Sequence, residues 1–113
     1  MESYVIRLEG EFDLSERHRL ADAFAVPSSA PIVVLDLSRA TYVDSIFLKH
    51  LIVLDTATRL RRARLFVVGP SPALRRLFAI CKLDESFVVR NSLDEVDGVD
   101  PARLRRLTLI ARS

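Results

Sequence analysis

Residues 32–37 form an apolar run that limits the folds open to this chain. Only Asp36 interrupts the run, and turn-forming residues flank it on both sides. A strand with one wet face alternates apolar and polar residues, whereas a continuous apolar run is typical of a strand buried on both faces. The run therefore predicts the central strand of a sheet with helices packed on it.

Strand-like and helix-like segments alternate along the rest of the chain. Apolar and β-branched runs predict further strands at 3–9, 64–68 and 87–90, the first of which bends or ends at Gly10. Capping residues before apolar residues at helical spacing predict helices at 15–25, 45–60, 72–81 and 101–111, with a helical turn starting at Ser92. Residues 38–44 are expected to form a connection.

The order β-α-β-α-β-α-β-α favours an α/β fold with a largely parallel central sheet, because parallel strands need helical crossovers. At 113 residues the chain has the length of one domain, and no repeat or linker divides it. The final helix is expected to begin at the Asp100-Pro101 pair. Its inward residues would then be Leu104, Leu107 and either Ile110 or Ala111.

Composition excludes several classes of protein. Cys81 is the only cysteine, so neither an intrachain disulfide nor a cysteine-based zinc cage can form, and its place on an apolar helix stripe predicts a buried, inert thiol. No apolar run reaches the roughly 18 residues that a membrane-spanning helix needs. The first residues lack the pattern of a signal peptide. We therefore expect a reduced, cytoplasmic protein.

Charge is distributed unevenly along the chain. Residues 1–57 hold five basic and nine acidic residues, whereas residues 58–113 hold twelve and six. This uneven charge would be consistent with one acidic and one basic partner-binding face. Chance placement of charged residues on solvated helix faces is the simpler explanation. A net charge of +2 is weak evidence for nucleic-acid binding, and none is expected.

Enzyme chemistry has little support in the sequence. His18 and His50 lie on different predicted helices, and both are interpreted as surface or boundary residues. The chain has no Gly-x-Ser-x-Gly elbow, and the single glycine at Gly69 is too few for a phosphate-binding loop. We predict a binding protein with no cofactor or metal.

One junction stands out as a candidate site. Asp44 is placed to cap the helix at 45–60, and Ser45 follows it at the first turn. A phosphate on Ser45 would meet the free backbone N–H groups and the positive end of the helix dipole. The residues alone favour a simpler interpretation, in which Asp44 is only a cap and Ser45 only a common first-turn residue.

Four segments together resemble the STAS domain, a family that includes bacterial anti-sigma-factor antagonists and modules of sulphate transporters. The resemblance covers about residues 4–97. Gly10-Glu11-Phe12-Asp13 after a strand resembles the family's Gly-Glu-Leu-Asp, and Asp44-Ser45 resembles the start of its Asp-Ser-Ser-Gly-Leu motif. The other matching segments are 32–38 and 64–69 with 72–78. The motif departs at Ile46 and Phe47, which replace Ser and Gly, and Leu48 restores the Leu.

The resemblance implies a mixed, largely parallel sheet of four to five strands with helices on one side. It also implies partner switching, in which an unphosphorylated antagonist binds an anti-sigma factor that is also a serine kinase and so frees the sigma factor. That kinase would phosphorylate Ser45, and a phosphatase would reverse the reaction. The chain itself would be a monomer or a weak homodimer. The implied partner-binding residues are Asp13, Thr41, Asp44, Ser45, Ile46, Phe47 and Lys49.

The departures from the motif keep other functions open. A bulky Phe47 would either narrow access to Ser45 or build a different partner surface. The family's usual strand before residue 4 is expected to be missing. Two alternatives to the antagonist are a STAS accessory subunit of an ABC transporter, for example in lipid trafficking, and a protein of a stressosome-like scaffold.

Overall fold

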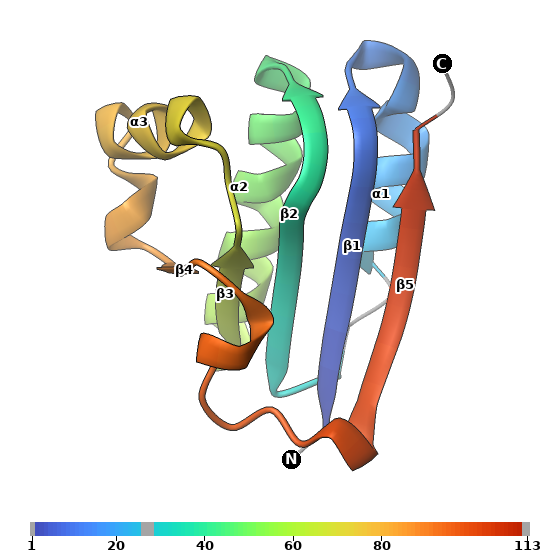
Figure 1. The fold of residues 1–113 in the computed structure, drawn as a ribbon, viewed down its shortest axis with the longest axis vertical. Helices are drawn as coiled ribbons and strands as arrows, with labels where there is room; N and C mark the ends of the chain where they lie inside the picture. Colours follow the sequence, from blue (N-terminus) through green and yellow to red (C-terminus); the bar gives the residue numbers. More distant parts are fainter. Residues whose placement is uncertain (1, 26–28, 112–113) are drawn as a thin grey trace.

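The computed structural model describes residues 2–25 and 29–111, which form one sheet with helices against it (Figure 1). The sheet has five strands in the order β4-β3-β2-β1-β5, and every pairing is parallel. The strands are β1 (Ser3–Phe12), β2 (Ile32–Val43), β3 (Arg64–Val68), β4 (Val88–Arg90) and β5 (Leu104–Ile110). The helices are α1 (Arg17–Ala25), α2 (Ser45–Leu60) and α3 (Pro72–Ile80). The expected α/β fold with a central strand at 32–37 is confirmed, but the sheet is wholly parallel, whereas the resemblance implied a mixed one.

Helices α1 and α2 lie behind the sheet in Figure 1, and α3 lies beyond the upper end of β3. Leu74 and Phe78 of α3 pack into the same core as α1 and α2, so the helices belong to one side of the sheet, as expected. Alternate side chains of β1, β2 and β3 meet the inner sides of these helices in the main core. Leu35 of β2, Phe47 of α2 and Phe78 of α3 are all completely buried there. These buried side chains join α2 and α3 to the central strand in one core.

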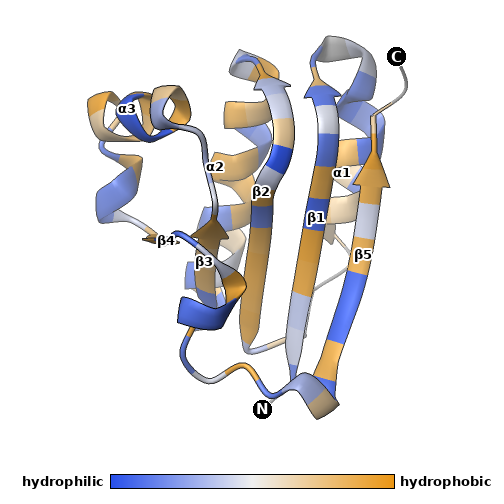
Figure 2. Cartoon of the chain, in the orientation of Figure 1, coloured by the Kyte–Doolittle hydropathy of each residue, from blue (hydrophilic) through white to orange (hydrophobic). Residues whose placement is uncertain are grey.

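The opposite face has a smaller core under an irregular cover. Val34 and Phe66 are buried on this side, beneath a segment that runs from β4 to β5 in front of the sheet (Figure 2). That segment contributes Val96, which is buried, together with the half-buried Leu93 and Val99. The apolar run at 32–37 is therefore buried on both faces, but helices provide only one of the two covers.

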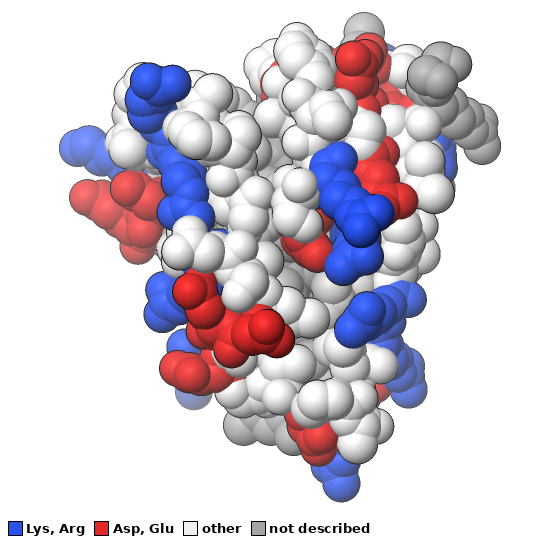
Figure 3. Space-filling model, in the orientation of Figure 1, with Lys and Arg blue, Asp and Glu red and all other residues white. Residues whose placement is uncertain are grey.

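Charged side chains occupy the part of this second face that the segment leaves open. Arg7 Nε lies 3.2 Å from Asp36 Oδ2, and Arg39 Nη1 lies 3.3 Å from Glu9 Oε1. Asp36 Oδ1 also accepts hydrogen bonds from the backbone N–H and the hydroxyl of Ser38, which satisfies a carboxylate that is almost fully buried. Acidic and basic side chains are interspersed over this view of the molecule (Figure 3).

The strand β2 is longer than the sequence indicates, so the prediction of a connection at 38–44 is wrong. This stretch pairs with β1 from Glu9↔Arg39 to Phe12↔Val43, with register shifts between Arg7 and Glu9 and between Gly10 and Glu11. Gly10 has φ of +100°, a conformation that glycine adopts easily, so the first strand bends there and continues to Phe12. This part of β2 lies beyond the end of its pairing with β3, so its side chains are mostly exposed and the strand lacks an apolar signal.

The predicted helix at 101–111 is also wrong. Asp100 does cap a turn, accepting a hydrogen bond from Ala102 N, but only the 3₁₀ turn Pro101–Arg103 follows. Residues 104–110 then form β5, which pairs with β1 from Ser3↔Leu104 to Glu9↔Ile110. The free edge of β1 offers a row of backbone hydrogen-bonding groups, and pairing with it overrides the helical start signal.

Smaller corrections concern helix ends. Cys81 is exposed and caps the C-terminus of α3, so it is not the buried residue that the helical spacing predicted. The first predicted helix begins with the 3₁₀ turn Leu14–Glu16 before α1. The helical turn predicted from Ser92 is confirmed as a 3₁₀ turn, Leu93–Glu95.

Candidate functional site

The junction between β2 and α2 has the capped geometry that the sequence predicts. Asp44 is the N-cap, with extended backbone, and its Oδ1 accepts hydrogen bonds from Ile46 N at 3.0 Å and Phe47 N at 3.2 Å. Ser45 is the first residue of α2, and it is exposed. The cap uses two of the free N–H groups at the helix end and leaves the Ser45 hydroxyl open to solvent.

Phe47 points away from this surface, which corrects its assignment as a partner-binding residue. It is completely buried and meets Phe24 of α1 edge-on, with ring centroids 6.5 Å apart. Residues two apart on a helix differ by about 200° in direction, so a buried Phe47 leaves Ser45 outward. Phe47 therefore neither narrows access to Ser45 nor builds a partner surface.

Asp13 lies on the β1–α1 side of the junction. Its Oδ1 accepts hydrogen bonds from the Ser15 hydroxyl at 2.6 Å and from Ser15 N at 2.9 Å. These bonds hold the pKa of the Asp13 carboxyl below its usual value, with the hydroxyl contributing most. An open hollow of about 560 Å³ brings Asp13 and Asp44 together, with Ser15, Arg17 and His18 completing its lining.

The sequence did not single out Arg17 and His18 as site residues. His18 was interpreted as solvated, and it is exposed, with Arg17 Nε donating to its Nε2 at 3.4 Å. Their place in the hollow depends on the turn Leu14–Glu16, which directs the start of α1 toward Asp44. No motif or residue spacing in the sequence predicts the direction of α1 relative to Asp44.

Thr41 lies on the other side of the junction, toward α3. It is exposed and lines a groove of about 270 Å³ whose other lining residues are Tyr42, Val43, Ser71, Ala73, Leu74 and Leu77. Tyr42 is 53% exposed and was not predicted to belong to the site. Ser71 caps α3 by accepting a hydrogen bond from Leu74 N. Helices α2 and α3 both begin at the same end of the sheet (Figure 1).

Two further predicted residues lie on α2. Lys49 is exposed one helical turn beyond Ser45, so the two share a helix face. Ile46 is half-buried beside them. The structure therefore brings Asp13, Thr41, Asp44, Ser45, Ile46 and Lys49 to one end of the domain, whereas Phe47 lies in the core.

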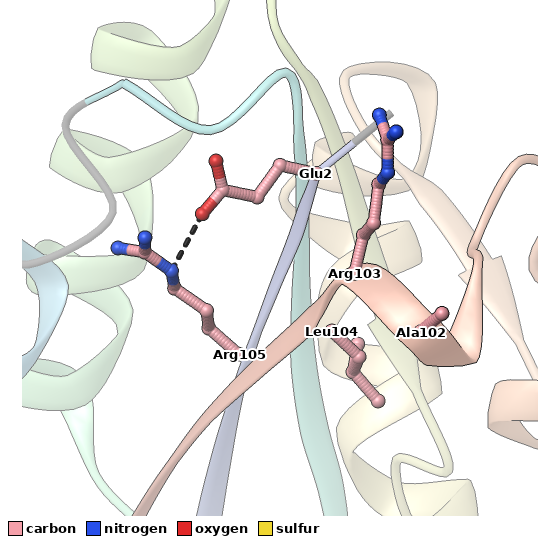
Figure 4. Close-up of a pocket in the computed structure, with 5 residues that line it drawn as sticks. All are labelled: Glu2, Ala102, Arg103, Leu104 and Arg105. Carbon is pink, nitrogen blue, oxygen red and sulfur yellow. Dashed lines mark ion pairs between the residues drawn. The ribbon is translucent and has the colours of Figure 1, made fainter.

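A second hollow, of about 420 Å³, lies near the start of β1 and β5 (Figure 4). Glu2 Oε1 forms an ion pair with Arg105 Nε at 2.6 Å, and Arg103 points away from that pair. The charge of Arg105 is thus balanced within the chain. Among the described residues, no group of three His, Cys, Asp or Glu side chains is placed to hold a metal ion. In the same ranges no helix has the length and hydropathy needed to cross a membrane.

Comparisons with known proteins agree with this architecture. The family model described as "Mlab, STAS domain" matches residues 1–91. A STAS-domain-containing protein of Pseudomonas aeruginosa is 29% identical over 85 residues, which cover 74% of this chain and 84% of that protein.

Solved structures of other proteins share this fold. A putative anti-sigma factor antagonist from Thermotoga maritima aligns with a TM-score of 0.71 and 16% identity over 77% of each chain. An anti-sigma factor antagonist from Mycobacterium paratuberculosis aligns with a TM-score of 0.64 and 28% identity, covering 77% of this chain and 75% of that one. With its parallel sheet, its capped α2 and a family match over most of its length, the chain belongs to the STAS domain family.

Proposed function

We propose that this chain is an anti-sigma-factor antagonist that acts by partner switching. Its unphosphorylated form binds an anti-sigma factor that is also a serine kinase, and phosphorylation of Ser45 by that kinase ends the complex until a phosphatase removes the phosphate. The observation that carries the proposal is the exposed Ser45 hydroxyl at the start of α2, beside an Asp44 cap and above a buried Phe47. The antagonists among the similar structures support it.

The surface around Ser45 suits a protein partner. Thr41, Ser45 and Lys49 are exposed around the end of β2 and the start of α2, and Asp13 and Asp44 line the adjoining hollow. These groups supply donors, acceptors and both signs of charge over a shallow area. A partner of this kind would contact Asp13, Thr41, Asp44, Ser45, Ile46 and Lys49, with Phe47 only supporting them from the core.

A phosphate on Ser45 would change binding more than folding. It adds a charge of about −1.5 to −2. Within the domain the helix N-terminus favours an anion by about 0.3–1 kcal/mol, while the Asp44 carboxylate repels it. Under a docked partner the same charge loses its water, which costs several kcal/mol when no cation replaces it. A penalty of about 4 kcal/mol weakens binding roughly a thousandfold.

The first test identifies the phosphorylated residue. The chain is incubated with its cognate kinase and ATP, and the products are analysed by mass spectrometry. We expect one phosphate on Ser45 and none in the Ser45→Ala variant. Labelling at another residue, or no labelling of the intact chain, would contradict the switch.

The second test separates the partner classes. Tagged Ser45→Ala and Ser45→Asp variants are expressed in the native cell, and the bound proteins are identified by mass spectrometry. We expect Ser45→Ala to retain the anti-sigma factor kinase and Ser45→Asp to lose it. Thr56→Asp is the matched control, because Thr56 is exposed on the same helix away from the junction. Recovery of an ABC ATPase with both Ser45 variants would instead favour the transporter subunit.

A further inference from the structure

The two edges of the sheet differ in length and regularity. The edge strand β4 has three residues, whereas β5 has seven, and β5 keeps an unbroken register against β1. Residues 104–110 contain no proline, and within the described part of the chain β5 pairs with β1 alone. Long, regular edges present free backbone groups, and proteins usually shorten, bend or cover them. The edge of β5 has none of these protections except its arginines.

The hydrogen-bond pattern shows which backbone groups of this edge are free. Ala111 N donates to Glu9 O at 2.8 Å, so the backbone of residue 111 faces β1. Backbone direction alternates along a strand, so residues 105, 107 and 109 also face β1, while 104, 106, 108 and 110 face outward. The outward groups of Arg106, Thr108 and Ile110 can therefore pair with another strand at no loss to the sheet.

Side chains along the same edge leave apolar surface open. Leu107 and Leu109 are half-buried and line an open hollow of about 320 Å³ with Arg19, Asp22 and Ala23 of α1. Ile110 is 60% exposed on the other side of the strand. A strand added beside β5 would cover this surface. Which strand binds there depends on which sequence is complementary to residues 104–110.

We propose that a second copy of this chain occupies this edge, with the two β5 strands antiparallel and the two-fold axis at Leu107. This register pairs all seven residues of each strand. Leu107 faces Leu107 of the other copy, Arg106 faces Thr108, and Leu104 faces Ile110. The remaining pair is Arg105 with Leu109.

Charge favours this register over the registers centred on either arginine. With the axis at Arg105 or Arg106, arginines would face each other, and like charges directly opposite are destabilising. With the axis at Leu107, no arginine faces an arginine. Arg105 is already paired with Glu2 of its own chain. Asp22 lies beside Leu109 in the hollow, on the side that receives the copy's Arg105. The strand is thus complementary to itself, which a two-fold interface requires.

Charge substitutions at Thr108 test the register. Sedimentation over a concentration series should show a monomer–dimer equilibrium for the natural chain. Thr108→Glu places a carboxylate opposite Arg106 twice, and should tighten the dimer about two- to thirtyfold. Thr108→Lys, at the same exposed position, should weaken it by a similar factor. Thermal unfolding of both variants at low concentration checks that each monomer remains folded.

A disulfide test locates the axis. At the axis Leu107 forms a non-hydrogen-bonded pair with Cα atoms about 4.5 Å apart, a separation that a disulfide can span. In a Cys81→Ser background, Leu107→Cys should form a covalent dimer on oxidation, and Val53→Cys, exposed on α2, should not.

Three results would overturn the proposal. The first is a chain that stays monomeric at every concentration. The second is a dimer that Thr108→Glu and Thr108→Lys both weaken or both leave unchanged. The third is a monomeric chain whose binding to another protein is lost in the Thr108→Lys variant, because β5 would then pair with a strand of that protein.

Discussion

The two faces of the sheet are covered by different kinds of structure. On one face, three helices pack over a core that includes Leu35, Phe47 and Phe78. On the other, a segment with only short 3₁₀ turns packs over Val34 and Phe66, and ion pairs occupy the remainder. Helices carry an amphipathic period that is visible in a sequence, whereas an irregular cover carries none. The difference explains why one face was predictable and the other was not.

Deleting residues 100–113 should have the largest effect, because it weakens both faces. The deletion removes β5 and with it Leu109 from the helical side and Leu104 from the other. It also exposes the backbone edge of β1. We expect a loss comparable with the whole stability of a small domain, about 5–15 kcal/mol. Urea unfolding followed by circular dichroism should then show no cooperative transition, and an unchanged midpoint would make the segment a dispensable tail.

Substitutions at two adjacent residues of β2 compare the faces directly. Leu35 and Val34 are both completely buried, and they point to opposite sides of the sheet. Leu35→Ala should cost about 2–5 kcal/mol of unfolding free energy. Val34→Ala removes two buried methyl groups, each worth about 0.8 kcal/mol, and leaves a cavity, so it should cost about 1.5–3 kcal/mol if the second face is a true core. A loss below about 0.5 kcal/mol for Val34→Ala would mean that this face behaves as surface.

A smaller effect is expected from the irregular cover itself. Val96 is buried against the second core, so Val96→Ala removes two methyl-sized groups, each worth about 0.8 kcal/mol. We expect a loss of about 1–2 kcal/mol in chemical denaturation. Val53→Ala is the control, because Val53 is 61% exposed on α2 and should change stability by less than about 0.5 kcal/mol. Equal effects of the two substitutions would show that the segment is not closely packed.

The smallest effect should come from Asp13, which belongs to neither core. Its hydrogen bonds to Ser15 lower its pKa in the folded state below the ordinary value of 3.8. Its contribution to stability is therefore present above about pH 3.8 and is lost as the pH falls through the lower, folded-state pKa. Asp13→Asn should reduce this part of the acid dependence and leave stability near neutral pH only slightly lower. Unfolding midpoints measured across that range, with Asp84→Asn as an exposed control outside every proposed surface, check the assignment.

The candidate site was predictable where it depended on neighbouring residues. Asp44 and Ser45 were placed at a helix start because a cap and the N–H groups it satisfies lie within three residues of each other. Tyr42 was missed because the residues around it were expected to be a loop. Phe47 was assigned to the partner surface from its place in a motif, although its burial depends on where α1 lies.

The sequence by itself determined the alternation of strands and helices, the central place of β2 and the start of α2. Each of these follows from local patterns, because burial periodicity and capping act between residues close in the chain. Only the tertiary structure decided which secondary structure residues 101–110 adopt. Their leucines, arginines and alanine suit a helix, and Asp100 does begin one turn, but the unpaired edge of β1 lies beside them. Hydrogen bonds along that edge and contacts with both cores outweigh a weak local preference, because neither is available to the segment alone.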